Sequence, residues 1–218
     1  MTAMVNIVRI VPAILTNDPV ALGKMVRLAE SFTDFVQIDI MDGEFVPSQS
    51  ISFNDIAPLK PKFKWEAHLM VQNPENYLEG FKQAGAKKIV FHFEARTNYV
   101  KTIKAIRTLK LQVGLAVNPK TSIKELAPLV MLADSILFLS VEPGFYGAKF
   151  VPEVLDKIIE FRKLFPGVKI GVDGGVKEEN IREIAQTGVN DICVGSAIFS
   201  RPDPAAAYRR LVELATVT

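Results

Sequence analysis

Four polar residues lie inside strongly apolar runs of this chain and are its best candidates for chemistry. Gln37 and Asp39 occur in FVQIDIMDG, His68 occurs in WEAHLM, and Asp173 occurs in IGVDGG. Runs of this composition are normally buried, and burying an unpaired charge costs several kcal/mol. A chain that keeps two carboxylates and an imidazole in such runs generally uses them together, for metal binding or proton transfer. The pattern favours an enzyme.

The two aspartates could act as an acid and a base on opposite faces of a small substrate. Repulsion between neighbouring carboxylates raises one pKa and lowers the other, which divides the two roles. The pair suits inversion of a carbon next to a carbonyl: one Asp removes a proton, a planar enediolate forms, and the other Asp protonates the opposite face. Alternatively, each carboxylate only caps a loop, which is the interpretation we adopt for Asp42 in MDGEF.

The two histidines and the single cysteine have simpler alternatives. His68 is either a ligand of a divalent cation, which would polarise a substrate carbonyl, or a hydrogen-bonded core residue. His92, in VFHFEA, is expected to support the site from behind or to be structural. Cys193, in DICVG, is expected to be a buried strand residue and not a nucleophile.

Short β-branched runs alternate with amphipathic segments along the whole chain, so parallel strands followed by helices should position these residues. The expected strands are Ile7–Leu15, Phe35–Ile40, Trp65–Met70, Lys88–Phe93, Gln112–Val117, Ser135–Val141, Lys169–Val172 and Asp191–Val194. The expected helices are Val20–Ser31, Pro74–Ala84, Val100–Leu109, Val151–Leu164 and Glu178–Thr187. Eight such units in 218 residues indicate a closed (β/α)8 TIM barrel, with an open doubly wound sheet as the alternative.

Barrel enzymes carry their catalytic groups at the C-terminal ends of the strands or in the loops that follow. The polar residues that fall at such ends are Asp39, His68, His92, Ser140 and Asp173. Loops after the seventh and eighth strands commonly bind phosphate through free backbone N–H groups. Gly174 and Gly175 follow the seventh expected strand, and Gly195 and Ser196 follow the eighth. The segment Pro143–Gly147 (PGFYG) could supply a third loop, through Gly144 and Gly147.

Composition narrows the class of protein further. Hydrophobic residues make up 49% of the chain and charged residues 23%, enough for a large core. A net charge of +2, without basic runs, argues against nucleic-acid binding. No apolar run is long enough for a membrane span, and no signal peptide is evident. We expect one domain over residues 1–218, because no linker-like or low-complexity segment interrupts the pattern, and we expect a cytoplasmic location.

Over nearly its whole length the chain resembles the ribulose-phosphate 3-epimerase family. The matching segments are PAIL, QIDIMDGEFVP, AHLMVQNPENY, FHFEA, LAVNPKT, SVEPGFYGAKF, VDGGV and VGSAIF. The resemblance implies a barrel that interconverts ribulose 5-phosphate and xylulose 5-phosphate, assisted by one divalent cation such as zinc, manganese, magnesium or iron. By motif position, Asp39 and Asp173 would be the acid and base and also metal ligands, with His68 as a third ligand. Met41 and Met70 would cap the reacting carbon, and Gly174, Gly175, Gly195 and Ser196 would hold the phosphate.

The departures from the family pattern fall near the expected site. Gln37 stands where the family usually has His, which leaves its role as a fourth metal ligand in doubt, since an amide oxygen suits zinc less well than imidazole does. Ala13 replaces a usual Ser, Leu139 a usual Met, and Tyr146 and Ala148 a usual Gly and Gln.

Three interpretations follow from these departures. The chain is an epimerase with weak or altered metal dependence, an epimerase or isomerase of another sugar phosphate, or a barrel that only binds sugar phosphate. Retention of both aspartates argues against the last, and the absence of a Lys soon after Asp39 excludes a barrel decarboxylase. The resemblance also implies a homo-oligomer.

Overall fold

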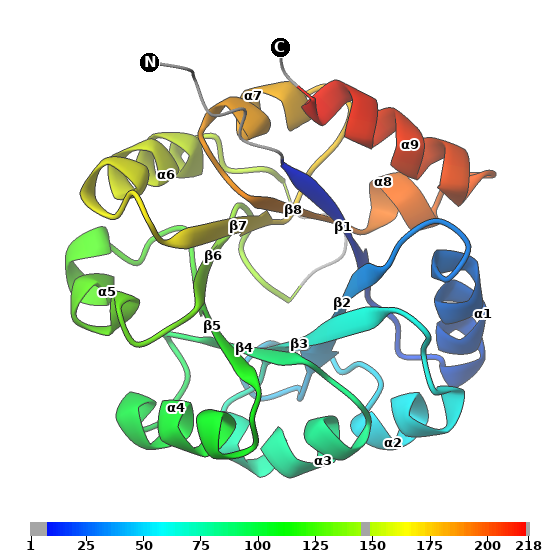
Figure 1. Ribbon diagram of the computed structural model, residues 1–218, viewed down its shortest axis with the longest axis horizontal. Helices are drawn as coiled ribbons and strands as arrows, with labels where there is room; N and C mark the ends of the chain where they lie inside the picture. Colours follow the sequence, from blue (N-terminus) through cyan, green and yellow to red (C-terminus); the bar gives the residue numbers. More distant parts are fainter. Residues whose placement is uncertain (1–7, 145–148, 217–218) are drawn as a thin grey trace.

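The computed structural model describes residues 8–144 and 149–216. In them the chain forms a closed barrel of parallel strands surrounded by helices (Figure 1). The strands are β1 Arg9–Ile14, β2 Phe35–Met41, β3 Lys64–Met70, β4 Lys88–His92, β5 Gln112–Val117, β6 Ser135–Leu139, β7 Lys169–Asp173 and β8 Asp191–Val194. Each strand pairs with the next, and β8 pairs with β1 to close the ring, so the predicted (β/α)8 fold is confirmed.

Helices lie outside the barrel, in the connections between strands and in the segment after β8 (Figure 1). They are α1 Pro19–Ala29, α2 Phe53–Ile56, α3 Leu78–Gln83, α4 Tyr99–Thr108, α5 Ile123–Val130, α6 Glu153–Leu164, α7 Ile181–Gln186, α8 Ser196–Phe199 and α9 Pro204–Ala215, with short 3₁₀ turns η1 Ala57–Leu59 and η2 Pro74–Asn76. None of the helices in the described ranges is long and apolar enough to cross a bilayer.

The sequence pattern missed several of these helices for identifiable reasons. Helix α5 carries Pro128 in its interior, a residue that normally ends a helix, but a capping box between Ser122 and Glu125 fixes its start. Helix α9 begins with a run of alanines, which blurs the apolar period. The single helix predicted over Pro74–Ala84 is divided into η2 and α3.

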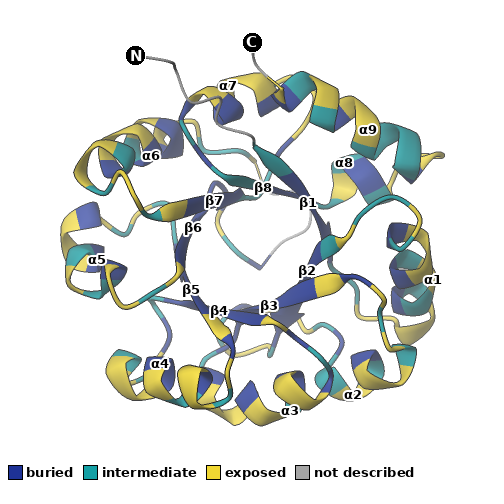
Figure 2. Ribbon diagram, in the orientation of Figure 1, coloured by how far each residue is buried: buried dark blue, intermediate teal, exposed yellow. Residues whose placement is uncertain are grey.

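Alternation along the strands creates two separate cores. Residues such as Ile38 and Leu69 face outwards and pack in a large cluster against the helices, whose outer faces are exposed (Figure 2). The intervening residues point into the barrel. The apolar interior cluster comprises Val11, Ala13, Val90, Ala116, Leu137, Leu139 and Cys193. Polar side chains share this interior at both ends of the barrel, and those at the C-terminal end form the candidate site.

Candidate active site

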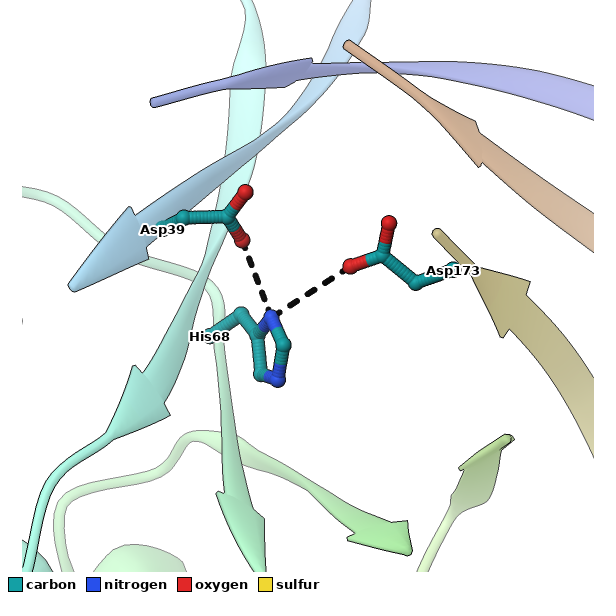
Figure 3. A group of neighbouring side chains, drawn as sticks. All are labelled: Asp39, His68 and Asp173. Atoms are coloured by element: carbon teal, nitrogen blue, oxygen red, sulfur yellow. Dashed lines mark hydrogen bonds and ion pairs between the residues drawn. The ribbon is translucent and has the colours of Figure 1, made fainter. Parts of the chain in front are cut away.

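Three of the residues singled out in the sequence converge at the C-terminal end of the barrel. Asp39, His68 and Asp173 come from β2, β3 and β7, and their side chains point toward one another (Figure 3). Asp39 and His68 are direct partners in the β2–β3 register. His68 Nδ1 lies 2.9 Å from Asp39 Oδ1 and 3.5 Å from Asp173 Oδ2. The two carboxylates therefore face each other across the barrel with an imidazole nitrogen between them.

Gln37 lies next to this group, on the side toward the N-terminal end of the barrel, and is fully buried. Its Nε2 donates hydrogen bonds to Asp39 Oδ1 at 2.9 Å and to Asp173 Oδ2 at 2.7 Å, and lies 3.5 Å from His68 Nδ1. On the other side of the amide, Gln37 Oε1 accepts a hydrogen bond from Cys193 Sγ at 3.1 Å. Cys193 is buried as predicted, but its contact with Gln37 was not foreseen, because the two residues are 156 positions apart.

Burial and charge displace the pKa values of this group. Burial, together with the negative charge of Asp173, raises the pKa of Asp39 to about 6, although hydrogen bonds from His68 and Gln37 oppose the shift. Burial alone would lower the pKa of His68. Its hydrogen bonds and charge interactions with Asp173 and Asp39 outweigh burial and raise that pKa to about 10. At neutral pH the imidazole of His68 therefore carries a proton between the two aspartate side chains.

His92 lies directly behind His68, in the supporting position expected from the sequence. The two rings are stacked, and their Nε2 atoms are 3.0 Å apart. Burial lowers the pKa of His92 to about 4, so its neutral ring accepts from protonated His68. His92 Nδ1 lies 3.3 Å from Glu94 Oε2 and can donate to it. Glu94 in turn accepts from the backbone N–H of Asn118 and the hydroxyl of Thr121, so the relay of side chains is anchored in the loop after β5.

A cavity of about 380 Å³ opens above the carboxylates. It brings together all but two of the predicted site residues: Asp39, Met41, His68, Met70, Gly144, Asp173, Gly174, Gly175, Gly195 and Ser196. Gln37 lies beneath the cavity floor and does not line it. Gly147, with Tyr146 and Ala148, falls outside the described residues. Ala13 and Leu139, the other departures, line the wall.

Glycine turns border the cavity after β7. Gly174 has φ +111°, and a Cβ there would lie 2.5 Å from Val141 Cγ2, so both conformation and space require glycine. The Ser140 hydroxyl lies within hydrogen-bond reach of the carbonyls of Asp173 and Gly174. Asn180 Nδ2 donates to the carbonyl of Gly175. These contacts hold the turn so that bare backbone faces the cavity.

Polar residues that the sequence analysis did not single out also line the cavity, namely Lys149, Lys177 and Asn180. Two of them follow recognisable loops, since Lys149 comes after PGFYGA and Lys177 after VDGGV. A lysine directly after a candidate phosphate loop is a signal that could have identified them. Asp42 lies at the rim in the capping role expected for it. Its carboxylate accepts from the backbone N–H groups of Glu44, Phe45 and Gln72.

Asp39, His68 and Asp173 form a group that could hold a metal ion, since one ligand atom from each lies within 4.8 Å of the others. The amide of Gln37 does not fit a cation at this point. The amide nitrogen stands where a fourth ligand atom would lie, beside the ligand atoms of Asp39, His68 and Asp173. Its hydrogens point toward the two carboxylates, into the space that a cation would fill. A metal would need an oxygen there, because an N–H group donates and cannot ligate. In this arrangement the residues are therefore arranged for hydrogen bonding.

Comparison with known proteins gives a consistent result. The family described as "Ribulose-phosphate 3 epimerase family" matches residues 9–199. "Ribulose-phosphate 3-epimerase, cytoplasmic isoform" of Oryza sativa subsp. japonica is 37% identical over 94% of both chains. "Ribulose-phosphate 3-epimerase" of Synechocystis sp. is 38% identical and covers 93% of this chain and 91% of its own.

Solved structures agree in fold at much lower sequence identity. One is the crystal structure of "KGPDC from Streptococcus mutans", with TM-score 0.73 and 14% identity, which covers 96% of this chain and 97% of its own. "3-Hexulose-6-Phosphate Synthase" has TM-score 0.70 and 20% identity, with coverage of 94% and 99%. Both support the barrel fold alone.

Proposed function

This chain belongs to the ribulose-phosphate 3-epimerase family, and from that premise we propose that it inverts C3 of ribulose 5-phosphate to give xylulose 5-phosphate. The observation that carries the proposal is the pair of carboxylates, Asp39 and Asp173, which reach one cavity from strands on opposite sides of the barrel. Glycine turns after β7 and β8 border the same cavity, at the place where barrels bind phosphate.

The reaction we propose needs one proton acceptor and one proton donor on opposite faces of C3. One aspartate takes the C3 proton and leaves a planar enediolate, and the other returns a proton from the opposite face. The donating aspartate draws its proton from His68, whose Nδ1 lies 2.9 Å from Asp39 and 3.5 Å from Asp173. Each turnover adds one proton to C3 and removes one, so the group ends with the single proton it began with.

The rest of the cavity supplies binding and exclusion of water. Met41 and Met70 belong to an apolar cluster with Val46 and would cover the enediolate. Backbone N–H groups at Gly174, Gly175, Gly195 and Ser196, with Gly144 across the mouth, would bind the phosphate. Lys149 and Lys177 line the same space and add positive charge toward a dianionic group.

A divalent cation on Asp39, His68 and Asp173 would polarise the substrate carbonyl. It could bind there only after the amide of Gln37 had turned its oxygen inward. The steps proposed above therefore use only groups of the chain. We further propose a cytoplasmic homo-oligomer, supported by a relative named as a cytoplasmic isoform, with its size to be measured by light scattering.

The proposal is tested by a coupled assay for conversion of ribulose 5-phosphate to xylulose 5-phosphate. We expect turnover by the parent enzyme and loss of turnover in Asp39→Asn and in Asp173→Asn. Asp42→Asn is the matched control, because its carboxylate caps a loop near the site and does not line the cavity. Binding of the sugar phosphate without turnover would contradict the proposed activity, and turnover of a different phosphorylated ketose in its place would reassign the substrate.

A further inference from the structure

We infer that Gln37 is a positioning residue whose amide holds Asp39 and Asp173 together, so that the active group is assembled without a divalent cation. The inference rests on the proposed function, since it assigns a role to the support beneath the proposed acid and base. It concerns a residue that does not line the cavity and therefore does not touch substrate there.

The first observation is geometric. Two like charges inside a barrel repel each other, and hydrogen-bond donors or a positive charge between them offset that repulsion. Gln37 Nε2 reaches both carboxylates, at 2.9 Å from Asp39 Oδ1 and 2.7 Å from Asp173 Oδ2. An amide N–H2 group has two hydrogens, and here each hydrogen has a carboxylate to bind. One neutral side chain thus makes two charge-assisted hydrogen bonds and bridges β2 to β7.

The second observation is that the amide is held in this orientation. Gln37 Oε1 accepts from Cys193 Sγ at 3.1 Å, and both side chains are buried in the barrel. Rotation of the amide by half a turn would place Oε1 beside two carboxylate oxygens, with acceptors facing acceptors. The same rotation would bring the N–H2 group against the thiol and lose the S–H···O bond. Both ends of the amide therefore favour the orientation observed.

The third observation is that this orientation opposes a cation. The two carboxylate oxygens that are paired with His68 Nδ1, Asp39 Oδ1 and Asp173 Oδ2, are the ones that accept from the amide. A metal must break both hydrogen bonds and turn the amide before it gains a fourth oxygen ligand. A His side chain at position 37 carries no such penalty, because a ring nitrogen with a free lone pair binds a metal directly.

The test is metal affinity, which can be measured without substrate. The parent protein, Gln37→His and Gln112→His would be treated with chelator, titrated with zinc or manganese, and analysed by calorimetry and elemental mass spectrometry. Gln112 is exposed at the other end of the barrel, so Gln112→His controls for adventitious binding to a new histidine. We expect Gln37→His to bind metal at least about tenfold more tightly than the parent and the control. Stoichiometric metal in the parent, as tight as in Gln37→His, would overturn the inference.

Variants of Cys193 test whether its hydrogen bond to Gln37 Oε1 fixes the orientation of the amide. Cys193→Ser keeps a donor to Gln37 Oε1 and should keep metal binding weak, with a kcat closer to that of the parent than Cys193→Val has. Cys193→Val removes the donor and frees the amide, so metal affinity should rise and kcat in chelator should fall while KM changes little. Equal behaviour of the two variants in all three measurements would contradict the role of the thiol.

Activity separates this inference from the proposed function. If the parent turns over ribulose 5-phosphate, its rate should be insensitive to chelator, and that of Gln37→His should become sensitive. If no variant turns over this substrate, the proposed function fails. Exclusion of metal from the parent and its binding by Gln37→His would then still support the role of the amide.

Discussion

The barrel interior holds buried polar groups at both ends, and the two ends are built on opposite principles. At the N-terminal end, Glu66 of β3 faces Lys88 of β4, with 2.8 Å between Oε2 and Nζ. Arg9 of β1, whose side chain is partly exposed, pairs with Asp191 of β8, with 2.8 Å between Nη2 and Oδ2. Both pairs are direct partners in the strand register, so closing the barrel matches each charge with its opposite.

At the C-terminal end the charges do not match. Asp39 and Asp173 are both acidic, and one imidazole and one neutral amide lie between them. Burial, together with repulsion from Asp173, raises the pKa of Asp39 to about 6, close to neutrality, where a carboxylate exchanges protons readily. A matched buried pair contributes to stability only if both partners stay, whereas an unmatched group remains available for chemistry. This difference in charge pairing indicates that the polar groups at the C-terminal end serve function and that those at the N-terminal end stabilise the fold.

The largest effect is expected from the unmatched end. Asp39→Asn and Asp173→Asn each remove one proposed proton-transfer group and should lower kcat by about 10²–10⁴-fold. Each variant also removes one of two repelling charges, so thermal stability should hold or rise. The coupled epimerase assay and a melting curve measure both quantities. If activity falls only in proportion to the amount of folded protein, the two aspartates have a structural role, and the proposed difference between the two ends of the barrel is wrong.

The matched end should respond in the reverse way. Glu66→Gln leaves Lys88 buried without its partner and should cost about 3–5 kcal/mol in the free energy of unfolding. Urea denaturation measures this cost. Turnover per folded molecule should stay near that of the parent, because neither residue lines the cavity. The double variant Glu66→Leu/Lys88→Met should recover most of the stability, and its failure to do so would show that the pair has a further role.

The pH profile tests the ionisation of Asp39 at the unmatched end. Below pH about 6, Asp39 becomes protonated and can no longer accept a proton from C3. The value of kcat/KM should then fall, approaching about tenfold per pH unit. Both directions of the reaction should show the same limb, because both start from ionised Asp39 beside protonated His68. A flat profile from neutral pH to well below 6, in folded protein, would rule out Asp39 as the titrating group.

The smallest effect is expected one layer behind the site. His92→Phe removes the acceptor for His68 Nε2–H while keeping a ring beside Phe45. We expect kcat to fall about tenfold, equivalent to about 1.4 kcal/mol, with KM nearly unchanged. His92→Gln offers an amide oxygen to His68 and should retain more activity. If both variants behave as the parent does, the His68–His92 contact has no part in turnover.

Much of the architecture could be predicted because it depends on local patterns. Strands such as Gln112–Val117 and Asp191–Val194 agree with the structure at both ends, since β-branched runs between turns are a strong signal. Whether a helix is recognised from the sequence, by contrast, can depend on a few residues, such as an N-cap, a proline or a short run of alanines. Helix α5 was missed because it contains Pro128, and helix α9 was missed because the alanines near its start blur the apolar period.

Which buried polar residues act together could be predicted only in part. The runs around Asp39, His68 and Asp173 identified the carboxylates and the imidazole, and the family resemblance related them to one site. Nothing in the run KWEAHLM distinguishes Glu66 from His68, which are two residues apart on β3 and both point inward. One pairs with Lys88 in a matched ion pair, and the other meets two aspartates.

The sequence by itself determined the barrel, the family and the residues available for chemistry. Each of these depends on alternating strands and helices, glycine turns or strand-end motifs, and such patterns are local to short segments of the chain. Only the tertiary structure decided the electrostatics. The meeting of Gln37 with Asp173, 136 positions away, and with Cys193, 156 positions away, depends on how β7 and β8 close against β1 and β2. Hydrogen bonds and Coulomb interactions act through space over a few ångströms, so the direction in which one amide points is settled by barrel closure.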